Sequence, residues 1–113
     1  MAIDESDAPV TLINIFEIDV SEVEAFMEGW RERAEFMSTQ PGFRSFRLHR
    51  ALSHDSRFQL VNVAEWDSPE ALRAATADER FQKSVREQMG KFDMTAHPAV
   101  YRVAVEKLGP AGG

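Results

Sequence analysis

An asparagine lies in the middle of an apolar segment that runs from Phe58 to Leu72 and reads FQLVNVAEWDSPEAL. Asn62 and Trp66 are four residues apart, so in a strand they share one face and lie about 13 Å apart, at roughly 3.3 Å per residue. Their carboxamide and indole N–H groups are donors that can hold the oxyanion of a flat aromatic ligand in an apolar pocket. The alternatives are that Asn62 bonds backbone at a bulge and that Trp66 is a plain core residue.

Two more polar residues can join this pair. Asn14 falls on the corresponding face of an earlier strand, where it either adds a second amide to the site or satisfies Asn62 while the site is empty. Arg86 lies beside the apolar ridge of a helix and turns either to solvent or toward the mouth of the pocket. The apolar part of the pocket is expected to come from Phe16, Trp30, Met37, Leu60 and Leu72.

The sequence lacks the residues for most other chemistries. It contains no cysteine, which excludes disulfides, thiolate metal ligands and a cysteine nucleophile. Its histidines lack the paired spacing of metal ligands, so no metal site is expected. Nucleotide-binding, serine-hydrolase and zinc-protease motifs are also missing. His97, directly before Pro98, is a candidate proton carrier if its loop folds over the cavity, and otherwise a loop residue.

The strands that must position these side chains follow from apolar alternation. Residues 10–18 place Leu12, Asn14 and Phe16 on one face and predict the first strand. Residues 43–52 alternate weakly and predict a positively charged edge strand. The third strand is predicted from Phe58 to Glu65 or Trp66, and the fourth over residues 99–108, entered through the His97-Pro98 bond.

Helices are predicted from apolar spacing and from capping residues. The expected start signals are a capping box at Ser21 and Glu24, an N-cap at Ser68 before Pro69, and an N-cap at Asp78. The resulting βαββαβ order is typical of an α+β, ferredoxin-like sandwich, in which helices cover one face of an antiparallel four-stranded sheet. Strands one and three should then be central neighbours.

Both faces of these central strands are apolar, although helices of one chain can cover only one of them. The other face, which carries no asparagine, is not expected to stay exposed, because exposure to water costs roughly 25 cal/mol per Å² of apolar surface. We therefore expect a homodimer whose sheets pack together through Ile13, Ile15, Val61 and Val63.

The length of 113 residues predicts a single domain, placed at residues 9–108, with tails at 1–8 and 109–113. The net charge of −6 forms no basic stripe, which argues against nucleic acid and anionic membranes as partners. The acidic N-terminus does not resemble a signal peptide and no apolar run reaches membrane-spanning length, so a cytoplasmic protein is expected.

Three segments, QPGFRSFRL, FQLVNVAEWDSPEAL and DERFQ, together resemble the antibiotic biosynthesis monooxygenase family of dimeric α+β barrel proteins. The resemblance runs from about Val10 to Val105. It is closest to the branch that oxidises polycyclic phenols of aromatic polyketide pathways to quinones with O₂ as co-substrate and without metal or flavin. For that branch it implies catalytic roles for Asn62, Trp66 and Arg86.

The resemblance also implies alternatives. Leu72 stands where the quinone-forming branch carries a substrate-contacting tyrosine, so the substrate or the route of proton transfer can differ. A haem-degrading branch shares Asn14, but its second tryptophan and its haem-ligating histidine would fall at about Ala75 and Val85. A third possibility is a barrel that binds an aromatic metabolite, or guides its cyclisation, without using oxygen.

Overall fold

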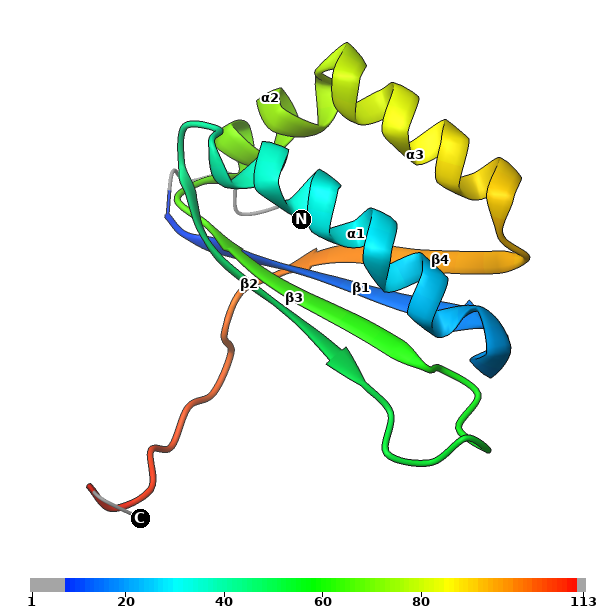
Figure 1. Ribbon diagram of the computed structural model, residues 1–113. Coiled ribbons are helices and arrows are strands. Elements are labelled where there is room, and N and C mark those ends of the chain that lie inside the picture. The colour runs from blue at the N-terminus through cyan, green and yellow to red at the C-terminus, as the bar shows by residue number, and fades with distance from the viewer. Residues whose placement is uncertain (1–7, 112–113) are drawn as a thin grey trace, which may run out of the picture.

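The computed structural model describes residues 8–111 and shows one four-stranded antiparallel sheet with helices on a single face (Figure 1). The elements are β1 (Val10–Ile18), η1 (Val20–Glu22), α1 (Val23–Ser38), β2 (Phe43–Arg50), β3 (Leu60–Trp66), α2 (Pro69–Ala77), α3 (Glu79–Lys91) and β4 (Met94–Tyr101). The strand order is β2-β3-β1-β4, which confirms the ferredoxin-like fold and the central pair β1 and β3. Residues 1–7 and 112–113 of the predicted tails lie outside the described residues.

The two central strands present their side chains as the alternation predicts. Along β3, residues alternate strictly between buried and half-buried, with Leu60, Asn62, Ala64 and Trp66 buried under the helices. The register pairs Asn14 of β1 directly with Asn62 of β3. Both amides therefore belong to the helix-covered face of the sheet.

Capping residues fix where the helices on that face begin. Ser68 Oγ accepts the amide N–H of Ala71 at 3.1 Å at the start of α2, as predicted. Asp78 caps α3 by accepting the N–H of Arg80 at 2.8 Å. The Arg80 side chain also donates to the Asp78 carboxylate, and the side-chain and backbone hydrogen bonds from Arg80 together hold the pKa of Asp78 below its usual value.

The predicted capping box at Ser21 and Glu24 is wrong. The N-cap is Asp19, whose carboxylate accepts the N–H of Ser21 at 2.9 Å and opens the short helix η1. The Ser21 hydroxyl donates to the same carboxylate, so it does not cap α1.

The predicted bounds of the last strand are also wrong, because β4 spans Met94–Tyr101 and contains both His97 and Pro98. β4 is an edge strand that pairs only with β1, and an edge strand tolerates a proline because one side of it needs no N–H donors. Its pairing ends at Tyr101 opposite Thr11, near the start of β1. The following residues run away from the sheet, and Val103 and Val105 are exposed (Figure 1).

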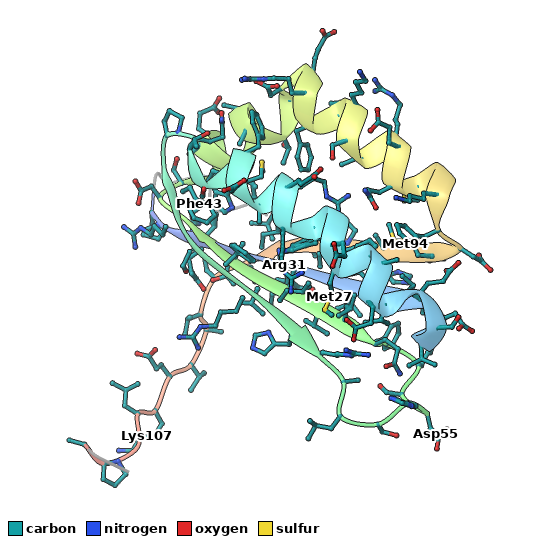
Figure 2. All side chains as sticks on the ribbon, in the orientation of Figure 1. Met27, Arg31, Phe43, Asp55, Met94 and Lys107 are labelled. Carbon is teal, nitrogen blue, oxygen red and sulfur yellow. The ribbon has the colours of Figure 1, made fainter. Side chains whose placement is uncertain are left out.

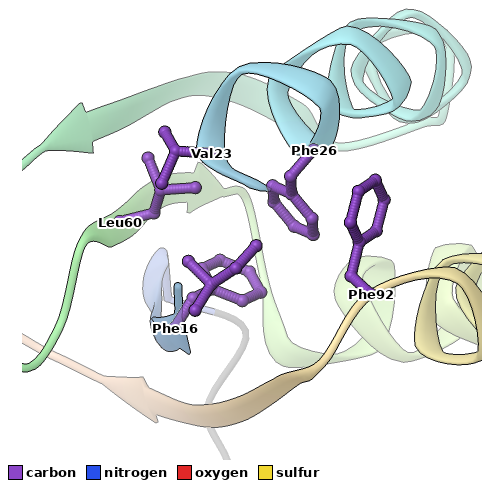
Figure 3. Packing of buried hydrophobic residues seen from close by; sticks show 6 residues of the cluster. Phe16, Val23, Phe26, Leu60 and Phe92 are labelled. Atoms are coloured by element: carbon purple, nitrogen blue, oxygen red, sulfur yellow. The ribbon is translucent and has the colours of Figure 1, made fainter. Parts of the chain in front are cut away.

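The buried side chains form two clusters rather than one. Phe16, Val23, Phe26, Leu60 and Phe92 form one cluster, in which the Phe26 ring lies 5.2 Å from that of Phe16 and 5.7 Å from that of Phe92 (Figure 3). The second cluster lies beneath α2 and consists of Val10, Ala64, Trp66, Leu72 and Ala75. Each cluster anchors one end of the helical layer, and the space between them is available to a ligand.

Gly42, in the turn that leads into β2, is the glycine that this fold requires most strictly. Its φ of 86° lies in the left-handed region, and a Cβ added there would lie 2.4 Å from the Cβ of Ala71. We expect Gly42→Ala to lower the free energy of unfolding by roughly 2 kcal/mol or more, measured by urea denaturation.

Gly90 provides the matched control for this substitution. It lies within α3 and a Cβ added there meets no atom within 4 Å. Gly90→Ala should therefore raise stability slightly, since alanine favours the helix. Equal effects of the two substitutions would contradict the role assigned to Gly42.

Candidate functional site

A cavity of about 140 Å³ lies between the helix-covered face of the sheet and helices α1 and α3. Its floor comes from β1, β3 and β4 and comprises Leu12, Asn14, Phe16, Asn62, Ala64, Trp66, Met94 and Ala96. Phe43 and Met94 lie toward opposite ends of the sheet and both line the cavity (Figure 2). The cavity thus occupies the region between the two core clusters.

Aromatic rings line much of the cavity. The Trp30 ring on α1 lies edge-on to Phe16, with centroids 5.7 Å apart, and 6.4 Å from Phe46. The Phe43 ring meets Trp66 edge-on at 5.4 Å. On the α3 side the lining is Phe81, Val85 and Met89. Such a lining suits a flat, apolar ligand, because aromatic rings favour offset and edge-to-face contacts with other rings.

Four buried polar atoms of this lining have no hydrogen-bond partner among the described residues. They are Asn14 Oδ1, Asn62 Oδ1, Trp30 Nε1 and Trp66 Nε1. A buried polar group left unpaired costs roughly 1–3 kcal/mol, so native proteins keep few of them. Their convergence on one cavity favours a polar, aromatic ligand as the missing partner.

The expectation that Asn14 satisfies Asn62 in the empty site is wrong. The two residues are direct cross-strand partners, yet the carboxamide oxygen of each is unpaired. Because an amide offers two donors and an acceptor, both side chains keep free hydrogen-bonding capacity for a ligand.

The structure brings six of the predicted site residues together in the cavity lining and leaves four outside it. Inside are Asn14, Phe16, Trp30, Met37, Asn62 and Trp66. Outside are Leu60, Leu72, Arg86 and His97. Leu60 lies on the helix-covered face of β3 and Leu72 lies on α2, and each is buried in one of the two core clusters, where it packs against lining residues.

Arg86 is exposed to solvent and does not line the cavity. Val85, the residue before it, does line the cavity, and one residue along a helix turns the side chain by roughly 100°. The sequence left two orientations open for Arg86, and the structure has the one that faces solvent.

His97 lies within β4 on the uncovered face of the sheet, so it is neither the loop residue nor the proton carrier over the cavity that the sequence left open. It is paired with Ile15 in the β1–β4 ladder, and its Nε2 lies 3.4 Å from Glu17 Oε1. The hydrogen bond from Arg57, and that of His97, lower the pKa of Glu17. The physical reason is that His97 belongs to a strand and not to a loop.

A cation that the sequence reading missed lines the cavity from α1. Arg33 follows Trp30 by three residues and Phe26 by seven, which is the spacing of one helix face. Its guanidinium carbon lies 5.1 Å from the Trp30 ring centroid and 5.4 Å from that of Phe26. Burial lowers the pKa of Arg33 to about 10, so it stays charged at neutral pH. The helical spacing was the signal that could have found it.

The residues present do not fit a haem with a histidine ligand. Val85 lines the cavity where the haem-degrading branch would place that ligand, and His49, His54 and His97 are all exposed. Within residues 8–111, no three His, Cys, Asp or Glu side chains gather as metal ligands would. None of the helices described is long and apolar enough to cross a membrane.

Solved structures provide similar folds. A proposed monooxygenase from Shewanella loihica is 35% identical, with a TM-score of 0.71 over 88% of this chain and 97% of that chain. SnoaB, a cofactor-independent oxygenase from Streptomyces nogalater, is 26% identical, with a TM-score of 0.75 over 91% and 99%. At 15% identity, a proposed antibiotic biosynthesis monooxygenase from Nitrosomonas europaea matches with a TM-score of 0.71 over 92% and 96%, which shows the fold alone.

The comparison of the sequence with family models gives the same assignment. No curated protein matches the chain in a sequence search. The model described as antibiotic biosynthesis monooxygenase matches residues 9–87, which include β1, β2, β3 and most of the cavity lining. Since this match covers well over half of the chain, the protein belongs to the antibiotic biosynthesis monooxygenase family.

Proposed function

We propose that this protein is a cofactor-independent monooxygenase that oxidises an electron-rich polycyclic phenol or anthrone to a quinone with O₂. The observation that carries the proposal is the set of unpaired amide and indole groups in an aromatic cavity. The likeness to SnoaB supports it, because that protein is a cofactor-independent oxygenase.

The chemistry follows from the electronic state of oxygen. Dioxygen is a triplet and reacts slowly with closed-shell molecules, so without a cofactor the substrate itself must become the electron donor. A phenolate or enolate is such a donor. In an anthrone, loss of one C–H proton gives the enolate, and transfer of one electron to O₂ gives a substrate radical and superoxide. Their recombination with a proton gives a hydroperoxide, and loss of water leaves the quinone.

Asn62 and Trp66 are the residues to which we assign stabilisation of that anion. Both are buried on β3, and the Trp66 indole N–H has no other partner among the described residues. Donors held in a site with little water need no reorganisation when the charge develops, which is why such groups are effective in catalysis. Arg86 lies outside the cavity lining, so we propose no contact between it and the reacting atoms.

Oxygen uptake tests the proposal directly. The purified protein, treated with a metal chelator, should consume O₂ when anthrone is added, with one quinone formed for each O₂ above the spontaneous rate. 10,10-Dimethylanthrone, which has no proton to lose at that carbon, should give no uptake and is the matched control substrate. Binding of anthrone without accelerated O₂ consumption would support the metabolite-binding alternative instead.

We further propose that the protein works as a homodimer with the uncovered faces of two sheets packed together. Ile13 pairs with Val63 and Ile15 with Val61, so the four aliphatic side chains form one patch on that face. Charged and polar groups border it, including the Thr11–Glu65 hydrogen bond at one end and the Arg57–Glu17 ion pair at the other. An apolar centre with a polar rim is the usual composition of a protein interface.

A further inference from the structure

Among the described residues that line the cavity, Arg33 is the one with a charged side chain. None of the ion pairs found in residues 8–111 involves it. Arg33 also lines a shallow pocket with Glu32 and Arg80; no ion pair joins it to Glu32, and Arg80 is paired with Asp78 at 3.0 Å. In the described part of the chain, Arg33 therefore has no carboxylate within ion-pair distance.

The aromatic rings around Arg33 stabilise its positive charge but do not satisfy its N–H donors. The faces of Trp30 and Phe26 lie 5.1 and 5.4 Å from the guanidinium carbon, a range in which aromatic rings attract cations. A guanidinium has five N–H donors, and a ring face does not accept hydrogen bonds from them as an oxygen anion does. Arg33 is half-buried, so part of its hydration is lost, and an anion in the cavity would compensate for that loss.

We propose that the ligand of this cavity is an aromatic carboxylate and that Arg33 pairs with its carboxylate group. The planar guanidinium fork matches a carboxylate in geometry, because two parallel N–H groups can meet its two oxygens. Arg33 belongs to the helical roof, whereas Asn62 and Trp66 belong to the floor. The carboxylate would bind at the roof and the phenolic oxygen at the floor, so that Arg33 determines which aromatic molecules bind and how they are oriented.

The test compares two ligands that differ in charge but hardly in shape, 2-naphthoate and 2-naphthamide, by calorimetric titration at neutral pH. The wild-type protein should bind 2-naphthoate at least tenfold more tightly than 2-naphthamide. Arg33→Met should abolish that preference and change the affinity for 2-naphthamide less than twofold. Arg33→Lys, which keeps the charge but not the fork, should retain part of it.

Arg31 is the matched control, since it lies two residues away on the same helix and is exposed (Figure 2). Arg31→Met should leave the preference for 2-naphthoate unchanged. Equal binding of the two ligands to the wild type, no binding of either, or a preference that survives in a folded Arg33→Met protein would overturn the proposal.

This inference depends on the proposed function only in placing the ligand in the same cavity, and the two can fail separately. Charge preference without oxygen uptake would leave Arg33 in its role and remove the oxygenase activity. Oxygen uptake with anthrone but no charge preference would keep the oxygenase activity and remove the role of Arg33.

Discussion

Asn62→Ala is expected to lower the turnover number for anthrone oxidation about a hundredfold, because a single preorganised oxyanion donor contributes that much in other enzymes. Trp66→Phe should act similarly, since it removes the indole N–H while keeping an aromatic ring against Phe43. Steady-state oxygen uptake under saturating substrate measures both effects. Unchanged turnover in both variants would remove these two residues from the mechanism.

A further substitution, Asn62→Leu, should lower activity without lowering stability. Asn62 Oδ1 has no partner among the described residues, so Asn62→Leu removes an unpaired buried amide and should preserve or raise the melting temperature while turnover falls. A drop in both quantities would mean that Asn62 serves the fold.

Gln59 provides the matched control for Asn62, since it is also a buried amide and lies three residues earlier in the chain. Its Nε2 donates to the backbone carbonyls of Ser53, His54 and Ser56 and so holds the loop between β2 and β3. Gln59→Ala should therefore lower stability without lowering turnover per folded molecule. A hundredfold loss of turnover there would show that any buried amide near β3 has the same effect.

The placement of Asn14, Asn62 and Trp66 on one face could be predicted because a strand has a side-chain period of two. Once β1 and β3 are neighbours, no other arrangement keeps Leu12, Phe16 and Leu60 under the helices. Alternation alone does not predict the register that makes Asn14 and Asn62 direct cross-strand partners. It depends on how β1 and β3 align, which no single residue determines.

The helical part of the site was harder to predict, because a residue beside an apolar stripe is turned by roughly 100° from it and can face either the cavity or solvent. Arg86 follows the lining residue Val85 by one position, and this rotation leaves it in solvent. Arg33 is on the same face of α1 as Trp30 and Phe26, and this spacing places its side chain on the cavity side of the helix. A charged residue in register with an apolar stripe is thus better evidence for a pocket cation than a charged residue beside one.

The error in β4 has a different cause. An X-Pro bond favours extended backbone and so predicts the entry to a strand. At an edge, however, proline fits inside the strand, so the strand began earlier, at Met94, and His97 moved from a loop to the outer face of the sheet. Sequence alone did not tell whether the last strand was an edge or a centre strand at that point.

Val63→Asp is expected to convert the protein from a dimer to a monomer. Val63 lies opposite Ile13 at the centre of the aliphatic patch, and in a symmetric dimer one substitution introduces two carboxylates into the same apolar interface. The dimer dissociation constant should rise by a hundredfold or more, as measured by light scattering coupled to size-exclusion chromatography. Circular dichroism should still report a folded chain, because this face of the sheet is not covered by its own helices.

Leu52→Asp distinguishes this effect from a general consequence of added charge. Leu52 is fully exposed in the loop after β2, so the same kind of substitution there should leave the dimer unchanged. A monomeric wild type at micromolar concentration, or a Val63→Asp protein that remains dimeric, would contradict the proposed interface. In the latter case the exposed apolar residues after β4, Val103, Val105 and Leu108, would be the next surface to test, since they also lack cover within the chain.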